Sequence, residues 1–366
     1  MTTTRRTFIK EAAALSSASV LAGKGMIRGA GAQTPDYRRI AVEEIYCPPE
    51  VMEASIRAIN ANPDLEPNFR GNFSPDNARF VNGRIIERLQ DVGEERLRAM
   101  DEGRIDKVLL SNWAPGVQLF ETEEARELAT VSNDRMAEAA RANPDRYAGM
   151  ITIAPQDPEA AGLEIERGIS LGLTGVLINS HTHDEYLDDP KFWPIFEVCE
   201  ARDVPIYLHP RVPAPQMFQA FSEYNMHGAM WGFAIEASTH ALRLIGAGVF
   251  DRFPNLTLVL GHMGEGLPFW LYRLDTTSAG YVGRTISRPP SEYVRDNMLI
   301  TTSGMGWDPA LLLSHSVLGA ENVMFAVDYP FGNYARDTAW FDAIDLPDAD
   351  KRLIYSGNAE RIYSLS

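Results

Sequence analysis

Short apolar runs rich in β-branched residues alternate with helix-like segments along most of this chain of 366 residues. Eight runs have the length and composition of buried strands, and they span residues 39–43, 107–110, 147–153, 175–178, 206–208, 256–260, 298–302 and 323–326. Helical patterns lie between them, including residues 85–101, 122–142, 158–171, 191–202, 234–247 and 309–318. Eight strands that alternate with helices predict an α/β protein, a parallel (β/α)8 TIM barrel.

The segments that connect these elements differ in length according to their direction. Those from a helix to the next strand are short and contain Pro, Gly or Asn, as at residues 142–146, 172–175 and 252–255. Three of those that follow a strand are longer and span residues 47–82, 179–189 and 210–231. In a TIM barrel the loops after the strands form the catalytic face, so we expect inserted loops to cover a pocket there. No linker divides residues 33–366, which we interpret as one domain.

Four polar residues directly follow apolar runs: Glu43, His209, His262 and Asp328. Each alone has a scaffold interpretation, since Glu43 could form an ion pair and Asp328 could begin a turn. Together they follow four different strands, and the C-terminal ends of barrel strands converge on one mouth. Carboxylates and imidazoles gathered there are the ligands that a divalent metal ion needs. The pattern therefore predicts a metal-assisted active site.

The composition limits the classes of partner. A net charge of −16 argues against a nucleic-acid-binding protein, which needs a basic face, and equally disfavours binding to an anionic membrane surface. A small anionic substrate stays compatible with this charge, because a cation in the site reverses the local field. The hydrophobic fraction of 45% is typical of a folded globular protein.

The first 32 residues have the pattern of a targeting segment rather than of a fold. Residues 4–10, Thr-Arg-Arg-Thr-Phe-Ile-Lys, are similar to a twin-arginine export signal. A short apolar stretch follows at residues 12–23, and Ala30-Gly31-Ala32 offers a cleavage site. The stretch is too short to span a bilayer, so we expect no membrane insertion. Residues 1–32 are thus predicted to direct the mature domain, residues 33–366, to the periplasm.

The remaining cysteine and histidine residues give weaker signals. Cys47 and Cys199 lie in unrelated contexts, and their spacing leaves disulfide pairing open, although structural burial is the default. His181 and His183 follow the fourth predicted strand in a polar loop, where we expect contact with solvent or substrate rather than with metal. We interpret the histidines without a partner pattern as structural: His227, His240 and His315.

Motifs around the four polar residues resemble those of the amidohydrolase-2 branch of the amidohydrolase superfamily. They are residues 40–44 (Ile-Ala-Val-Glu-Glu), 208–210 (Leu-His-Pro), 261–266 (Gly-His-Met-Gly-Glu-Gly) and 327–331 (Val-Asp-Tyr-Pro-Phe), with supporting phrases at residues 110–115, 186–190 and 356–359. Within that branch, the chain is most similar to metal-dependent nonoxidative decarboxylases of aromatic acids, such as the γ-resorcylate and 5-carboxyvanillate decarboxylases. The resemblance spans almost the whole mature chain.

The resemblance implies a role for each of these positions. Glu43, His209 and Asp328 match the residues that bind a divalent ion, Zn or Mn, in the family. The active-site histidine and the carboxylate that orients it match His262 and Glu265, and a family arginine near the substrate matches Arg273.

The chain departs from the family pattern at one position. The family carries a second ligand two residues after the first, as H-x-H or E-x-H, and here that position is Ile45. A branched hydrocarbon cannot coordinate a metal, so we expect lower metal affinity or a mechanism without metal.

The implied activity is the removal of CO2 from a hydroxylated aromatic carboxylic acid, with Asp328 protonating the ring carbon and Arg273 holding an anionic oxygen of the substrate. Two alternatives stay open on the sequence. One is hydrolysis of a lactone or ester, which loss of a ligand at Ile45 makes more credible. The other is an exported binding protein without catalytic activity. Family relatives also imply a homo-oligomer.

Overall fold

The computed structural model describes residues 36–62, 65–67, 84–280 and 282–365. The chain divides into two units, Met1–Asp36 and Tyr37–Ser366, and the description that follows concerns the second. The predicted export signal lies outside the described residues. Among the described residues, no helix has both the length and the apolar character needed to cross a membrane.

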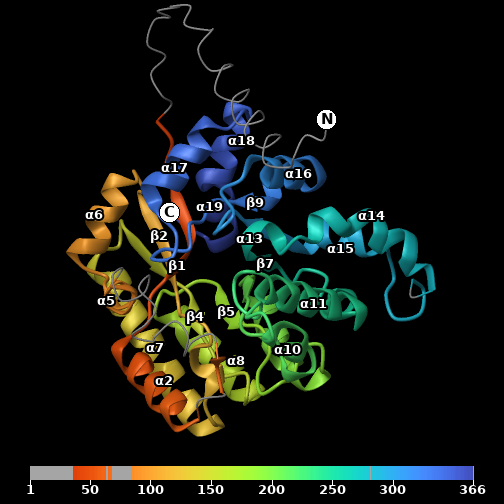
Figure 1. Cartoon of the computed structure of the whole chain (residues 1–366), viewed down its shortest axis with the longest axis horizontal. Coiled ribbons are helices and arrows are strands. Elements are labelled where there is room, and N and C mark those ends of the chain that lie inside the picture. Colours follow the sequence, from red (N-terminus) through yellow and green to blue (C-terminus); the bar gives the residue numbers. More distant parts are fainter. Residues whose placement is uncertain (1–35, 63–64, 68–83, 281, 366) are drawn as a thin grey trace, which may run out of the picture. The chain divides into compact units, whose positions relative to one another are not determined.

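Parallel strands form the centre of the second unit (Figure 1). They are β1 (Ile40–Ile45), β2 (Lys107–Ser111), β3 (Tyr147–Gly149), β4 (Ile151–Thr152), β5 (Val176–Asn179), β6 (Ile206–His209), β7 (Leu258–Leu260), β8 (Met298–Thr301) and β9 (Val323–Met324). Each strand pairs in parallel with the next along the chain, except that β3 and β4 are two pieces of one strand interrupted at Met150. The predicted number of barrel strands, eight, is therefore confirmed.

Backbone hydrogen bonds close the strands into a barrel. The amide of Val42 in β1 donates to the carbonyl of Phe325, which follows β9, at 3.2 Å. Further along, the amide of Ile45 donates to the carbonyl of Tyr329 at 2.8 Å. These bonds join the last strand to the first, so the predicted (β/α)8 TIM barrel is confirmed.

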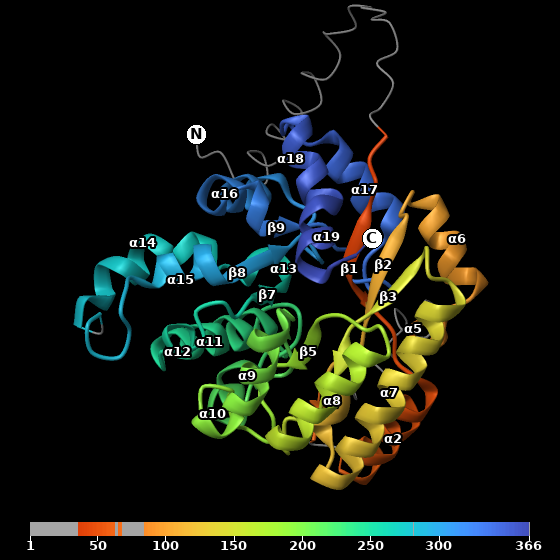
Figure 2. The same cartoon turned by 180° about the vertical axis from the view of Figure 1, so that it is seen from behind.

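Helices surround the strands in both cartoon views (Figure 1, Figure 2). They are α2 (Pro49–Ala61), α5 (Ile85–Gln90), α6 (Glu94–Glu102), α7 (Thr122–Ala142), α8 (Pro158–Ser170), α9 (Trp193–Arg202), α10 (Pro215–Ser222), α11 (Gly232–Gly246), α12 (Val249–Arg252), α13 (Gly261–Gly264), α14 (Leu267–Thr277), α15 (Pro290–Asn297), α16 (Asp308–Leu318), α17 (Tyr334–Ala343), α18 (Asp348–Arg352) and α19 (Asn358–Tyr363).

The prediction of one helix over residues 85–101 is wrong, because the helical conformation is interrupted between α5 and α6. The side chain of Asp91 accepts hydrogen bonds from the amides of Gly93 at 2.9 Å and Arg96 at 2.6 Å. A short acidic side chain that bonds to nearby amides competes with the helical pattern and starts a new helix.

Side chains of the strands alternate between two apolar layers. Tyr207 and Val259 belong to a cluster inside the barrel, to which every strand contributes at least one residue or, between β3 and β4, Met150. The neighbours of Tyr207, Ile206 and Leu208, belong instead to the cluster between the strands and the helices. Burial of each such aliphatic side chain contributes about 1.5–3 kcal/mol. Cys47 and Cys199 are both buried and free, as expected for structural cysteines.

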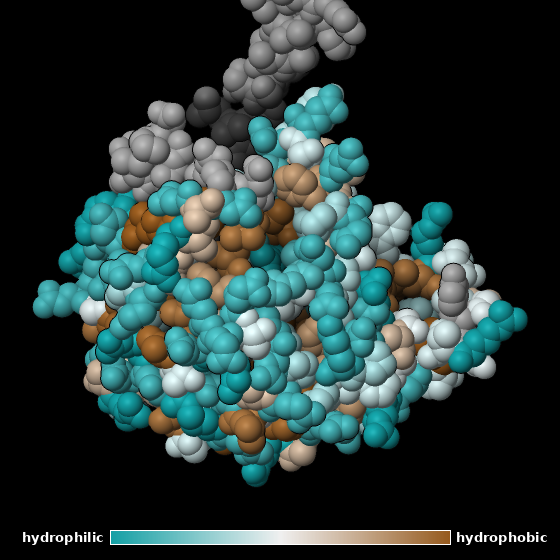
Figure 3. Space-filling model, turned by 90° about the horizontal axis from the view of Figure 1, so that it is seen from below, coloured by the Kyte–Doolittle hydropathy of each residue, from teal (hydrophilic) through white to brown (hydrophobic). Residues whose placement is uncertain are grey.

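Large apolar side chains are exposed near α11 and on α14. They include Trp231, which precedes α11, and Phe269, Trp270 and Tyr272 on α14. Elsewhere the surface is mixed, and one face of the molecule shows hydrophobic patches within a mostly hydrophilic surface (Figure 3). The exposed aromatic side chains are compatible with the homo-oligomer implied by the family, which stays a prediction.

A buried polar network joins α11 to the loops that follow β5 and β6. The hydroxyl of Ser180 donates to Glu236 at 2.8 Å, and the amide of Ala214 donates to the same carboxylate at 3.2 Å. His240 accepts a hydrogen bond from the amide of Leu187 at 2.9 Å and lies 3.1 Å from the hydroxyl of Ser180. Burial lowers the pKa of His240 to about 3, so this ring is neutral. These contacts agree with the structural role that we predicted for His240.

We predict that the free-energy cost of His240→Gln depends on pH. Below about pH 6.5 the unfolded chain binds a proton at His240 that the folded chain excludes, so this group loses its stabilising contribution as the pH falls. The destabilisation by His240→Gln should therefore shrink by about 2 kcal/mol between about pH 7.5 and about pH 5. Urea unfolding of both proteins measures it. Leu244→Ala, which removes a buried apolar group from the same helix, should give a cost that does not change with pH.

Candidate active site

Strand β1 contains a bulge beside the site. Ala41 pairs with Val108 and Glu44 pairs with Leu110, so β1 has one residue more than β2 over this interval. Side chains of a regular strand alternate between its two faces, and a bulge places two successive side chains on the same side. Val42 belongs to the cluster inside the barrel, and Glu43 bonds to groups on that same side. The bulge thus turns Glu43 inward and Glu44 outward.

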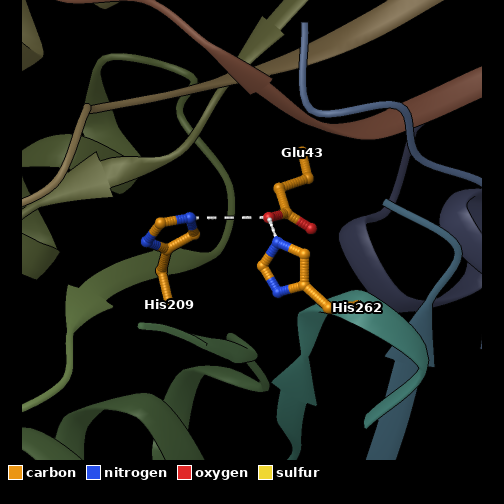
Figure 4. A group of neighbouring side chains, drawn as sticks. All are labelled: Glu43, His209 and His262. Carbon is orange, nitrogen blue, oxygen red and sulfur yellow. Dashed lines mark ion pairs between the residues drawn. The ribbon is translucent and has the colours of Figure 1, made fainter. Parts of the chain in front are cut away.

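The carboxylate of Glu43 is fully buried, and its two oxygens have different surroundings. Oε2 accepts hydrogen bonds from the hydroxyls of Tyr207 and Thr301, the latter at 3.0 Å. Oε1 has no hydrogen-bond partner among the described residues. It faces Nε2 of His209 at 3.6 Å and Nε2 of His262 at 3.5 Å (Figure 4). One side of the carboxylate is therefore fixed by hydroxyls, while the other is directed at two imidazoles.

His262 lies in a left-handed turn that follows β7. His262, Met263, Gly264 and Glu265 have φ values of 50°, 57°, 69° and 52°. Successive L residues in this conformation are costly, at about 1–2 kcal/mol each, and persist only where the surroundings hold them. A side chain at Gly264 would meet Ile300 at 2.7 Å, so the turn also requires glycine there. The result is that Oε1 of Glu265 reaches Nδ1 of His262 at 2.6 Å.

The two imidazoles carry different charges. Burial lowers the pKa of His209 to about 4, although the carboxylate of Glu43 opposes this shift. Burial also disfavours the charge of His262, but the carboxylates of Glu265, Glu43 and Asp328 outweigh it and raise its pKa to about 10. At neutral pH His209 is therefore neutral, and one of its ring nitrogens offers a lone pair. His262 is protonated, with Nδ1 directed at Glu265 and Nε2 directed toward Glu43.

A cavity of about 1100 Å³ opens at this end of the barrel. Its walls include the two histidines and Glu265, together with Asp328, which follows β9, and Arg273 on α14. Arg273 is exposed to solvent at the wall of this cavity. The catalytic, substrate-binding and metal-binding residues predicted from the sequence thus gather around one space, with Glu43 buried behind the histidines.

The predicted metal ligands divide into two groups. Glu43 and His209 lie with His262 in a group whose donor atoms are all within 4.8 Å of one another, the distance expected of a metal site. Asp328 lines the same cavity without belonging to this group. Ile45, at the position of the usual second ligand, is buried and also lines the cavity.

The donor set fits a divalent ion. Two ligands that each lie about 2.1 Å from a common ion are about 3.0–3.5 Å apart, close to the separations from Glu43 to the imidazoles. The buried Oε1 of Glu43 accepts no hydrogen bond from the described residues, so its lone pairs are available to coordinate a cation. One carboxylate and one neutral imidazole, with a further carboxylate nearby, suit a hard or borderline metal.

Several residues of the site were missed by the sequence analysis. Thr301 and Ser303 stand behind the site at the end of β8, where Thr301 bonds Glu43 and Ser303 accepts from the amide of His262 at 3.1 Å. The same rule that identified Glu43, polar residues after an apolar run, would have found them.

Arg211 lines the cavity and forms a buried ion pair with Glu66. His181, expected to contact solvent or substrate, is buried and bonds the carbonyl of Val212 at 3.0 Å.

Comparison with known proteins identifies the family. The amidohydrolase family model matches residues 88–365. The chain belongs to the amidohydrolase family. This confirms the membership expected from the motifs.

Two similar proteins with assigned activities are decarboxylases. This amidohydrolase is 36% identical to a γ-resorcylate decarboxylase of Polaromonas sp. over 308 residues, which cover 80% of this chain and 94% of the relative. The crystal structure of 5-carboxyvanillate decarboxylase from Sphingomonas paucimobilis is 42% identical, with a TM-score of 0.81, and covers 90% of this chain and 100% of the other.

A third similar protein was solved with ligands. It is the 5-carboxyvanillate decarboxylase of Novosphingobium aromaticivorans, complexed with manganese and 4-hydroxy-3-methoxy-5-nitrobenzoic acid. It is 38% identical, with a TM-score of 0.85, and the match covers 93% of this chain and 100% of that one.

We predict that Glu265→Gln lowers the pKa of His262 in the metal-free protein more than Asp328→Asn does. Glu265 contacts the ring directly, and its negative charge is the main influence that raises this pKa. Titration of the ring protons by NMR, in protein treated with a chelator, measures both shifts. A larger decrease for Asp328→Asn would show that the hydrogen bond between His262 and Glu265 does not control the charge of the ring.

Proposed function

We propose that this protein is a nonoxidative decarboxylase of a hydroxylated aromatic carboxylic acid and that it works with a divalent metal ion. The observation that carries the proposal is the convergence of Glu43, His209 and His262 beside a cavity that Asp328 and Arg273 also line. The activities of the similar proteins support it. Glu43 and His209 belong both to the predicted ligand set and to the observed group, so they are the principal ligands, with Asp328 and His262 beside them.

Binding of the substrate depends on the charge and shape of the cavity. When bound, a divalent ion neutralises the carboxylate of the substrate and fixes the orientation of the ring. Arg273 presents a planar guanidinium that can hold an anionic oxygen through two hydrogen bonds. Apolar walls, such as Trp113 and Phe331, offer surfaces against which an aromatic ring packs and water is excluded.

The reaction requires a proton at the ring carbon that carries the carboxylate. Asp328 lines the cavity and, in its protonated form, donates this proton while the phenolic oxygen supplies electron density to the ring. The bond between the ring carbon and the carboxylate carbon then breaks, its electron pair returns to the ring, and CO2 leaves. His262, which is protonated beside Glu265, passes a proton to Asp328 after each turnover and takes one up from solvent, so that the overall reaction consumes one proton.

We predict that the manganese-loaded mature protein releases CO2 from at least one acid in a panel that contains γ-resorcylate and 5-carboxyvanillate. Asp328→Asn should lower kcat by about 10³-fold or more, because an amide cannot donate the proton as a carboxylic acid does. The nitro analogue 4-hydroxy-3-methoxy-5-nitrobenzoic acid measures binding to the same variant. Retained binding with lost turnover separates proton transfer from a general loss of the site.

Two results would contradict the proposal. Acid release from a panel of lactones, with no CO2 from any hydroxybenzoate, would show that the protein is a hydrolase of the same family. Tight binding of the analogue without turnover of any acid or lactone would favour a binding protein.

We also predict that Ile45→His raises the affinity for manganese and zinc by about tenfold or more. The side chain at position 45 lines the cavity next to the proposed ligands, and histidine there supplies the nitrogen donor that isoleucine lacks. Competition with a fluorescent chelator measures the affinity of each protein. Ile45→Gln, which has similar volume and no imidazole, is the matched control, and an equal gain for that variant would contradict the role of the nitrogen.

A further inference from the structure

Glu44, which follows the proposed ligand Glu43, has a carboxylate that faces the other side of β1 and is fully buried. Its Oε1 accepts a hydrogen bond from the amide of Val327 at 2.9 Å, and its Oε2 accepts one from the amide of Tyr329 at 3.0 Å. These are the residues on either side of Asp328. One side chain of the first strand thus holds both neighbours of the proposed acid.

The amide of Asp328 itself is also bound to β1. It donates to the backbone carbonyl of Glu43 at 3.1 Å. Three successive amides, at residues 327, 328 and 329, are therefore accepted by the two glutamates of the bulged strand. The amide of Ile45 adds a bond in the reverse direction, to the carbonyl of Tyr329 at 2.8 Å. The backbone on both sides of Asp328 is held against one rigid strand.

This constraint matters because Asp328 has an unfavourable backbone conformation. Its φ is 64°, in the left-handed region that residues other than glycine seldom adopt. Without bonds that hold it, a residue in this region relaxes to the extended or right-handed helical region, which turns its side chain in another direction. The direction of the Asp328 carboxyl group toward the cavity therefore depends on the amides that flank it.

Burial of the Glu44 carboxylate is unfavourable by itself, and a scaffold contact at this place would not require it. Burial raises the pKa of Glu44 to about 8, although the amides of Val327 and Tyr329 and the charge of Arg96 oppose this shift. The guanidinium of Arg96 lies over the ring of Tyr329 at 5.0 Å and donates to the carbonyl of Ile45 at 2.6 Å. Two ionisable side chains, Glu44 and Arg96, are thus buried where the chain runs from β9 to the proposed acid.

We propose that Glu44 is a positioning residue for catalysis, which fixes the backbone of residues 327–329 so that Asp328 presents its carboxyl group to the substrate. This role rests on the proposed function, in which Asp328 protonates the ring. It requires both oxygens of the Glu44 carboxylate, because each accepts from a different amide. Glu44 itself does not contact substrate.

The test compares Glu44→Gln with a matched variant of another buried glutamate. Glutamine keeps the size of the side chain but replaces one acceptor oxygen by an NH2 group, which would face an amide donor with a second donor. Glu236→Gln makes the same change in a buried carboxylate that accepts bonds from Ser180 and the amide of Ala214, far from Asp328 in the sequence. It controls for a loss of stability that comes from any such substitution.

Two measurements are made on each full-length, manganese-loaded protein. Hydrogen exchange followed by mass spectrometry reports the amides of residues 327–329, and we expect exchange about tenfold faster or more in Glu44→Gln and unchanged exchange in Glu236→Gln. Decarboxylation kinetics should show kcat lowered about 100-fold with KM changed less than threefold in Glu44→Gln. Glu44→Asp, which keeps two oxygens on a shorter side chain, should recover part of kcat.

The outcomes separate this proposal from the proposed function. Wild-type kcat retained within threefold by Glu44→Gln, or an equal loss in Glu236→Gln, would overturn the positioning role while leaving the decarboxylase intact. If wild-type protein decarboxylates none of the acids, the proposed function fails. Unchanged exchange at residues 327–329 in Glu44→Gln would show separately that Glu44 does not fix the backbone of these residues. Faster exchange with lost kcat supports both.

Discussion

The bulge in β1 is the constraint on which the site depends. In a regular strand that begins with Ile40 inside the barrel, Val42 and Glu44 would face inward and Glu43 would face the helices. One extra residue between Ala41 and Glu44 reverses this order. It brings Glu43 to the two imidazoles and sends Glu44 to the amides on either side of Asp328. Two consecutive glutamates thereby act on opposite faces of one strand.

The surroundings of Glu43 determine how charge is distributed before any ligand arrives. Hydroxyl groups of Tyr207 and Thr301 bind one of its oxygens, so the carboxylate cannot rotate away from the histidines. Of the two imidazoles, only His262 has a second carboxylate in contact within the part of the chain that the structure describes, that of Glu265. The site is therefore asymmetric, with a neutral ring on one side of Glu43 and a charged ring on the other. This asymmetry suits a site that must both coordinate a cation and hold a proton.

The sequence was sufficient to predict the barrel and the place of the site, because both follow from local patterns. Apolar runs of strand length specify β1 to β9, and a polar residue at the end of such a run lies at the mouth of a barrel. The bulge had no such signature, since Val42 and Glu43 are ordinary strand residues and only the pairing with β2 shows the extra residue. The break at Asp91 was also hidden, because the apolar periodicity continues through it.

Contacts between side chains of different strands could not be predicted from local sequence patterns either, because they depend on how the strands are arranged in space. Tyr207 bonds Glu43, and His262 joins Glu43 and His209 in the group of close donor atoms. Both contacts depend on the tertiary arrangement of the strands, and the second also depends on the left-handed turn after β7. The structure does approach closely at Gly261 and Gly264, where an added Cβ would meet Glu43 at 3.0 Å and Ile300 at 2.7 Å, but glycine in the sequence does not specify the hand of a turn.

The isoleucine at position 45 changes the balance of donors as well as their number. Its side chain occupies a buried place beside the ligands, so a nitrogen donor is replaced by hydrocarbon, not by water. Two of the remaining proposed donors, Glu43 and Asp328, are carboxylates, and carboxylate oxygens suit hard divalent ions. Hydrocarbon beside a bound ion lowers the local dielectric constant, which strengthens the attraction between the ion and the carboxylates but also raises the cost of removing its hydration water. Isoleucine therefore supplies nothing that replaces the missing donor, and we expect this site to bind a divalent ion less tightly than a site with histidine at the same position.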